Sequence, residues 1–216
     1  MILADIEPAI ARISPAKPVT DPRAYTYLAT YPAFLALASE PGMFDLARFH
    51  QIAVMAYGWM PRILRLHREY TEPALTALQR ARTVTVDGLV AGDIEPVVRC
   101  LHSVVGASKI LHFVNPDVFP IVDSGIARFR GVPASDLEDE QQYCAYVREV
   151  HRIIGESGFD TFRQDFTAAY RARLEVSGIP PYEITPVRAV EAAAFELAPK
   201  QVPRSTRKRA RPGAEI

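Results

Sequence analysis

The feature that most limits the fold of this chain is the repetition of helix-start signals along it. Such signals occur at Thr71-Glu72-Pro73, Asp93-Ile94-Glu95-Pro96, Ser135-Asp136-Leu137-Glu138 and Thr185-Pro186. Together with apolar periodicity, they predict helices over residues 44–60, 74–82, 97–105, 135–155, 160–176 and 187–198. Segment 82–86 alternates like a strand, but it is short and lacks a convincing partner. The sequence therefore predicts an all-α, multi-helix globular domain.

The two ends of the chain differ in composition from its middle. Prolines at positions 8, 15 and 18 predict an extended N-terminal arm over residues 1–20, followed by the all-α domain over residues 21–199. Residues 200–216 are basic and have no apolar face, which predicts a disordered tail. This tail has a net charge of +5, so the remainder of the neutral chain has −5. Binding of nucleic acid to the body would therefore require a local basic patch.

Composition narrows the class of protein. The chain has 216 residues, and its content of 49% hydrophobic and 23% charged residues is ordinary for a globular protein. It has no run of 18 apolar residues and begins with acidic rather than basic residues, so we expect a cytoplasmic protein without a membrane partner. Neither the two cysteines nor the five histidines show metal-ligand spacing, and glycine-rich nucleotide motifs are missing from the sequence. We therefore expect no metal and no cofactor.

One stretch, from Val105 to Phe129, contains the best candidates for chemistry. Its sequence is VGASKILHFVNPDVFPIVDSGIARF. Gly106 is expected to end one helix, and Ser108 and Lys109 are expected to open the next. Two proline-containing turns then place Asp123 where a helix N-cap is expected. A lysine and a carboxylate in this order are compatible with a nucleophile and its acid/base partner, and equally with a surface charge and a helix cap.

Residues 101–129, LHSVVGASKILHFVNPDVFPIVDSGIARF, resemble the core of the helix-hairpin-helix DNA glycosylase superfamily, in particular its 8-oxoguanine glycosylase-like members. In that family a glycine-containing hairpin and a lysine precede a helix, a proline-containing loop and a catalytic aspartate at the next helix start. Gly106, Lys109 and Asp123 match this order. The chain keeps one hairpin glycine where the family usually has two, and it separates lysine from aspartate by 14 positions, a shorter connection than is typical.

The resemblance implies a base-excision glycosylase and lyase whose partner is DNA. Lys109 would form a Schiff base with the sugar, and Asp123 would stabilise the cationic sugar and move protons. Gly106, Ser108 and His112 would form the DNA-binding part of the site, with Gly106 and Ser108 at a phosphate and His112 beside the lysine. A flipped base would stack on an aromatic side chain, and the candidates are Tyr25, Tyr27, Tyr31 and Trp59.

Other interpretations of these residues stay open. One alternative is a non-catalytic all-α module that holds nucleic acid or a protein partner, and another is a structural or regulatory protein, which the acidic body would suit. Arg188 and Glu191 lie three positions apart on an otherwise apolar helix and predict a structural ion pair. Tyr57, Trp59 and Met60 are interpreted as core residues first. Nothing in the sequence indicates the oligomeric state.

Overall fold

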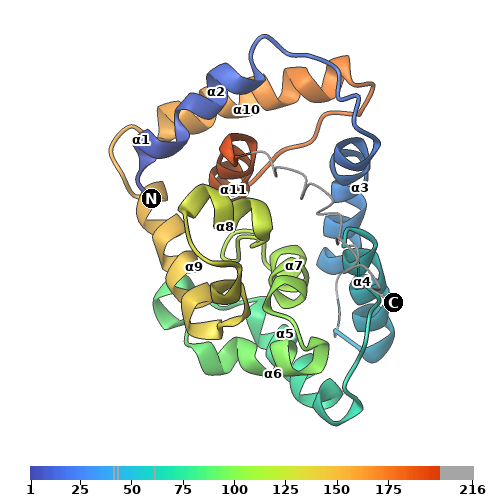
Figure 1. Cartoon of the computed structure of the whole chain (residues 1–216). Helices are drawn as coiled ribbons and strands as arrows, with labels where there is room; N and C mark the ends of the chain where they lie inside the picture. The colour runs from blue at the N-terminus through green and yellow to red at the C-terminus, as the bar shows by residue number, and fades with distance from the viewer. Residues whose placement is uncertain (41, 43, 61, 200–216) are drawn as a thin grey trace, which may run out of the picture.

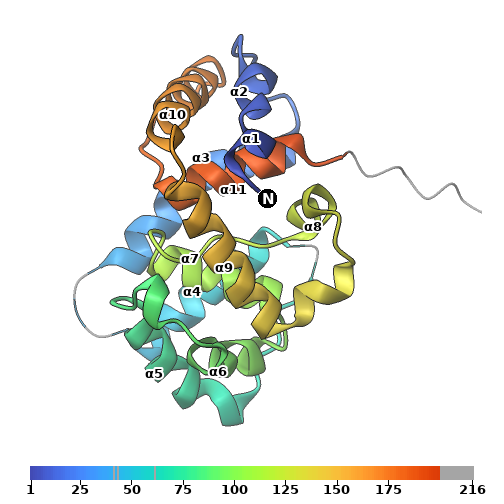
Figure 2. The same ribbon diagram turned by 90° about the vertical axis from the view of Figure 1, so that its left-hand side faces the viewer.

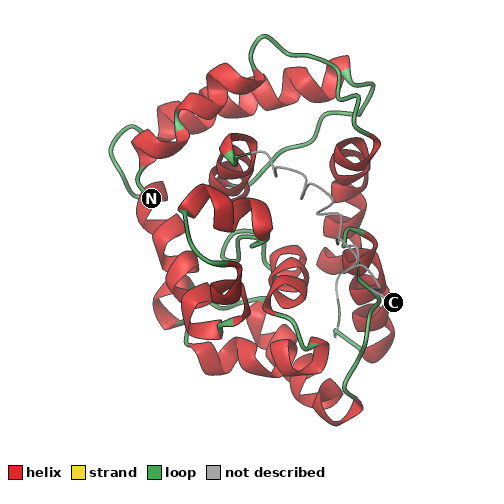
Figure 3. Ribbon diagram, viewed as in Figure 1, coloured by secondary structure: helices red, strands yellow, loops and turns green. Residues whose placement is uncertain are grey.

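The structure of the protein is a computed structural model that describes all residues except 41, 43, 61 and 200–216. The described residues form α-helices, short 3₁₀ turns and loops, and no strand occurs among them (Figure 3). The helices are α1 Leu3–Ile6, α2 Pro8–Ile13, α3 Pro22–Ser39, α4 Leu46–Gly58, α5 Thr71–Ala81, α6 Ala91–Leu101, α7 Val104–Val114, α8 Ser124–Arg130, α9 Glu140–Ile154, α10 Phe159–Val176 and α11 Pro186–Leu197. The 3₁₀ turns are Arg68–Tyr70, Val86–Gly88 and Ala134–Glu138. The predicted all-α class is therefore confirmed, and segment 82–86 is not a strand.

Helix α7 is the centre of the fold. All of its residues except Val105 are buried, as expected for a helix that is surrounded on every side. It packs against α3, α4, α5, α6 and the Ala134–Glu138 turn. Figure 1 shows α5 and α6 at one end of the molecule, with α10 and the N-terminal helices at the other. The candidate lysine therefore lies on the most enclosed helix of the protein.

The N-terminal arm is helical where we predicted it to be extended. Pro8 occupies the first turn of α2, a position where its missing N–H costs nothing. Ile6, Ala9 and Ile13 form an apolar stripe that is buried, because α1 and α2 pack on α10 and α11 (Figure 2). Only the connection after α2, residues 14–21, has the extended character that its prolines predict. The predicted disordered tail, 200–216, lies outside the described residues.

The corner between α6 and α7 also departs from prediction. Helix α6 ends at His102, which has φ 49° in the left-handed region, and Ser103 then caps α7 by accepting the N–H of Gly106 at 3.1 Å. Gly106 therefore lies inside a helix rather than at its end. A Cβ at this position would lie 2.9 Å from the Tyr57 hydroxyl, so any larger residue would require the Tyr57 ring to shift.

Other helix boundaries also differ from the prediction: α3 was not predicted, α5 begins three residues before position 74, and α6 begins six residues before position 97. The 135–138 segment was predicted to start a long helix, but it forms a 3₁₀ turn, and Asp139 caps α9 instead by accepting the N–H of Gln142 at 2.9 Å. Among the described residues, no single helix is long and apolar enough to span a membrane. The pair α6 and α7 passes the length and composition test together, but it is bent by 116°.

Candidate active site

A loop held by many side-chain hydrogen bonds leads to Asp123. Between α7 and α8 the backbone of residues 115–123 has no regular structure, yet side chains from three directions fix it. The carbonyls of Pro116, Val118, Phe119 and Pro120 accept hydrogen bonds from Thr185, His151, His112 and Tyr143, and the N–H groups of Ile121 and Val122 donate to Glu191 and Ser108. These six anchors come from α7, α9 and the start and first turns of α11. The loop therefore holds Asp123 in a fixed place, as a preorganised site requires.

Asp123 is the N-cap of α8, as predicted. Its Oδ1 atom accepts the N–H groups of Gly125 at 2.8 Å and Ile126 at 3.0 Å. Its Oδ2 atom makes no hydrogen bond with the described residues. Gly125 lets α11 approach closely, because a Cβ at that position would meet the Phe195 ring at 2.9 Å. One carboxylate oxygen thus caps α8, and the other has no hydrogen-bonding partner among the described residues.

Lys109 lies inside α7 rather than at its start, where we had expected it. The residue is only 5% exposed, and its amine makes no hydrogen bond or ion pair with the described residues. Ser108, its neighbour, accepts the N–H of Val122 at 3.2 Å, so the residues next to Lys109 and Asp123 are in direct contact. Burial lowers the pKa of Lys109, and the carboxylates of Asp123 and Glu191 offset this lowering only in part. The structure thus places Lys109 and Asp123 in one electrostatic environment.

A second pair of charges belongs to this environment. Arg188 and Glu191 on α11 form the predicted ion pair, and both are buried. Arg188 and Arg23 of α3 lower the pKa of Lys109, whereas Glu191 raises it. The sequence indicated that these two residues pair with each other, but not that their charges act on the pKa of Lys109. Residues 188–191 and 109 are far apart in the chain, and no local pattern connects them.

His112 is not available to DNA, contrary to our prediction. It is fully buried, and its Nδ1 atom lies 2.7 Å from the Phe119 carbonyl, so Nδ1 must carry the proton and donate it. Nε2 then accepts the Tyr31 hydroxyl at 2.8 Å. Burial lowers the pKa of His112 to about 3, so the ring is neutral. Its role is to hold the loop and α3 against α7.

Gly106 and Ser108 do not offer a phosphate site either. Both are buried, because α7 begins earlier than we predicted. The N–H of Gly106 is already bound to Ser103, and the hydroxyl of Ser108 is used by the Val105 carbonyl at 2.9 Å and by Val122. The predicted hairpin contact at these residues is therefore wrong.

The aromatic candidates divide into core and surface residues. Tyr31 and Trp59 are buried and belong to a cluster of packed rings with Phe34 and Phe113, and Tyr57 is also buried as predicted. Tyr25, by contrast, is 42% exposed. Of the stacking candidates, Tyr25 is therefore accessible in this structure, whereas Tyr31 and Trp59 are not, and Tyr27 is half-buried with its hydroxyl donating to the Trp59 carbonyl at 2.6 Å.

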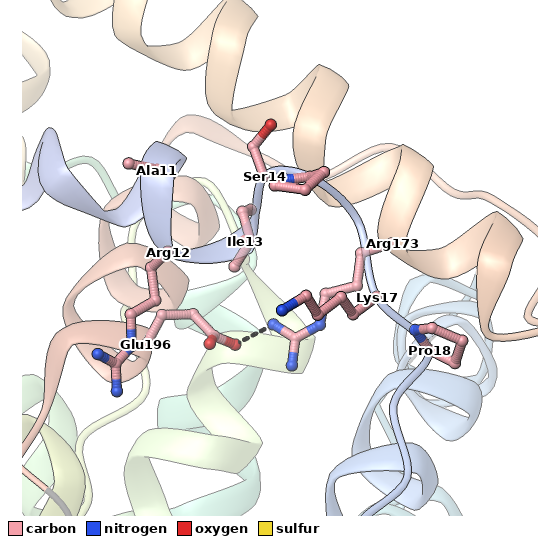
Figure 4. Close-up of a pocket in the computed structure, with 9 residues that line it drawn as sticks. Ala11, Arg12, Ile13, Ser14, Lys17, Pro18, Arg173 and Glu196 are labelled. Carbon is pink, nitrogen blue, oxygen red and sulfur yellow. Dashed lines mark hydrogen bonds and ion pairs between the residues drawn. The ribbon is translucent and has the colours of Figure 1, made fainter.

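A separate group of charges lines a surface cavity of about 280 Å³ between α2, α10 and α11. Figure 4 shows the cationic side chains of Arg12, Lys17 and Arg173 around the carboxylate of Glu196, which pairs with Arg173. Arg12 and Lys17 have no hydrogen-bonding partner among the described residues. These four side chains carry a net charge of +2, so the acidic body has at least one locally basic surface.

The described part of the chain contains no group of three or more potential metal ligands, and Cys100 and Cys144 are buried free thiols. Comparison with known proteins identifies no relative of the chain. No protein-family model, no curated protein and no solved structure matches the chain.

Proposed function

We propose that the protein is a DNA base-excision glycosylase and lyase that uses Lys109 as its nucleophile and Asp123 as the electrostatic and proton-transfer partner. The order of residues 101–129 supports this proposal through its resemblance to helix-hairpin-helix glycosylases. The fixed position of Asp123 and its free Oδ2 atom support it as well.

The observation that carries the proposal is the burial of an unpaired lysine. The side chain of Lys109 is 5% exposed, although its Nζ atom is not among the described polar atoms that are both buried and without a hydrogen bond, which are those of Tyr146 and Arg188. A lysine amine acts as a nucleophile only when it is uncharged, and desolvation at this site favours that state. The surroundings of Lys109 thus favour the uncharged amine that the proposed chemistry needs.

The reaction uses these two groups in sequence. Nζ of Lys109 forms a bond to the anomeric carbon of the sugar while the bond to the base breaks, and the base leaves with the bonding electrons. Asp123 takes the proton that the amine loses and supplies it to the departing base. Opening of the sugar ring, with a proton taken up by the ring oxygen, leaves an iminium on Lys109. Because Lys109 is only 5% exposed, bound DNA must open a path to the amine.

The test is borohydride trapping on duplex oligonucleotides that contain 8-oxoguanine, uracil or an abasic site. We expect a covalent adduct with the wild-type protein that is lost in Lys109→Gln and strongly slowed in Asp123→Asn. Lys17→Gln is the matched control, since Lys17 is exposed and lies outside the site. It should retain the adduct.

Absence of an adduct with every substrate would overturn the proposal. In that case, DNA binding that weakens with salt and is unchanged in Asp123→Asn would favour a non-catalytic binding module instead.

A further inference from the structure

The surface cavity between α2, α10 and α11 has three cations and a single carboxylate in its wall. Figure 4 shows the charged ends of Lys17 and Arg173 turned toward the carboxylate of Glu196, with Arg12 on the other side of that glutamate. The apolar part of the wall is formed by Ala11, Ile13, Pro15 and Pro18. The cavity of about 280 Å³ therefore combines a net charge of +2 with an apolar lining.

The backbone that carries Lys17 is fixed on both sides. Ile13, the last residue of α2, is buried. On the other side, the N–H of Val19 donates to the Oγ atom of Ser177 at 2.9 Å, and this hydroxyl donates to the carbonyl of Arg173 at 2.7 Å. The segment with Lys17 is therefore tied to the residue of α10 whose guanidinium lines the same cavity.

The excess of positive charge distinguishes this cavity from other charged parts of the described surface. Several exposed arginines each pair with a glutamate four positions away, namely Arg99, Arg152 and Arg171. In the cavity, Glu196 binds Arg173, whereas Arg12 and Lys17 make no hydrogen bond or ion pair with the described residues. Glu196 accepts from Nη1 of Arg173, and a guanidinium has five N–H donors, so donors remain for a second anion.

We propose that this cavity binds the phosphate group of a small phosphomonoester, held by Lys17 and Arg173 with Arg12 at the rim. A phosphomonoester carries a charge close to about −2 at neutral pH, which the net charge of the cavity balances. Guanidinium and ammonium groups donate charge-assisted hydrogen bonds to phosphate oxygens, and Glu196 orients the guanidinium of Arg173 for this contact. The apolar wall would contact the carbon part of the ligand.

This site is separate from the one proposed for catalysis. The residues that line it belong to α2, the connection after α2, α10 and α11, and none comes from α7 or from the loop before Asp123. The cavity volume is near the lower end of the range for small-molecule sites, so it suits a ligand of about the size of a sugar phosphate.

The experiment is an NMR titration of the ¹⁵N-labelled full chain with ribose 5-phosphate at low salt. We expect saturable shifts of the backbone amide signals of Ser14 and Lys17, which line the cavity. Lys17→Gln should weaken binding about tenfold, the loss expected for one hydrogen bond to a charged group. Glu196→Gln, whose amide oxygen still accepts from Arg173, should strengthen binding about threefold because it removes a negative charge beside the phosphate.

Arg171→Gln is the matched control, because Arg171 is also on α10 and also pairs with a glutamate but does not line the cavity. It should bind ribose 5-phosphate as the wild-type protein does. The phosphomonoester takes up its second proton with a pKa of about 6, so its binding should weaken between pH 7 and pH 5, whereas binding of sulfate should not.

Two results would overturn the proposal directly. One is the absence of saturable shifts, and the other is an equal loss of affinity in Arg171→Gln and Lys17→Gln. Tighter binding of an oligonucleotide without terminal phosphates, with shifts at the same amides, would also overturn it, since the cavity would then be a contact for phosphodiesters of nucleic acid.

The outcome is independent of the trapping experiment. Binding of ribose 5-phosphate without any DNA adduct would uphold this site and reject the enzymatic function. An adduct without binding of ribose 5-phosphate would do the reverse.

Discussion

Helix α11 carries two glutamates that each bind an arginine, and the two pairs lie in opposite surroundings. Glu191 and Arg188 are enclosed between α11, α3 and the Asp123 loop. Glu196 and Arg173 lie at the edge of the surface cavity, where their side chains are 24% and 20% exposed. Five residues rotate a helix by about 140°, so the two glutamates point to different sides of α11.

The difference shows how little the residue types decide. Both pairs are an arginine and a glutamate in hydrogen-bonding contact, but the inner pair is buried, where charges interact more strongly than in water. The outer pair has solvent as a competitor, and two further cations, Arg12 and Lys17, line the same cavity. The same two residue types thus form a partly exposed surface contact in one place and, in the other, a buried pair that binds the loop before Asp123.

The two ion pairs should differ most in the stability that is lost when the glutamate of each is removed. Glu191→Ala should lower the free energy of unfolding by about 3–5 kcal/mol, because it leaves the Arg188 charge buried without its partner. The measurement is urea denaturation beside wild-type protein. A loss below about 1 kcal/mol, the range expected for exposed pairs, would show that the inner pair is not isolated from solvent.

A double variant separates the pair from its charges. Arg188→Met combined with Glu191→Met should recover most of the stability that Glu191→Ala loses, since no unpaired charge remains. Failure to recover would mean that the hydrogen bond from Ile121 to Glu191 contributes most of the stabilisation.

The pH dependence of stability also distinguishes a buried group, His112, from an exposed one, His50. The pKa of His112 is about 3 in the folded protein, against an ordinary value of 6.5, so the unfolded chain binds more protons between these values. Stability is therefore complete above pH 6.5 and falls as pH decreases, by about 2 kcal/mol between pH 6.5 and 5. The free energy of unfolding measured at pH 7, 6 and 5 tests this dependence. His112→Gln should flatten this dependence, whereas the exposed His50→Gln should leave it unchanged.

A smaller effect is expected from the lysines on the two sides of the molecule. Lys109→Met should raise the free energy of unfolding by up to about 1 kcal/mol, because an apolar chain of similar length replaces a side chain that is only 5% exposed and whose burial disfavours the charged amine. Lys17→Met at the surface cavity should change it by less than about 0.5 kcal/mol. Thermal denaturation of both variants compares them. A marked destabilisation by Lys109→Met would show that the amine has a structural role.

The smallest effect concerns the outer pair. Glu196→Ala should lower the free energy of unfolding by about 1 kcal/mol or less, and 1 M salt should reduce this loss further because exposed charges are screened. Denaturation at low and high salt tests it. A loss that does not respond to salt would place the outer pair in the same class as the inner one.

Local signals in the sequence were sufficient for some parts of this structure. Asp123 is an N-cap because an aspartate before a serine and glycine after a proline turn can satisfy the first N–H groups of a helix by itself. Thr185 and Pro186 start α11 for a similar reason. The pairing of Arg188 with Glu191 follows from their spacing within one helix turn.

Other parts depend on contacts between distant segments. Gly106 looks like a helix end, yet the left-handed conformation of His102 moves the corner and leaves the glycine to admit the Tyr57 ring. Helices α1 and α2 form on the surface that α10 and α11 provide. The link from Glu191 to Ile121 joins residues 70 positions apart, and no spacing rule anticipates it.

The loop before Asp123 should also behave unlike other loops in hydrogen exchange. The amide hydrogens of Ile121 and Val122 point at buried side-chain oxygens of α11 and α7, and both residues are less than 5% exposed. Their exchange with deuterium therefore requires separation of whole helices, not the local fluctuation that frees most loop amides. These two amides should exchange as slowly as those in the middle of α7, so this irregular segment belongs to the most slowly opening part of the protein.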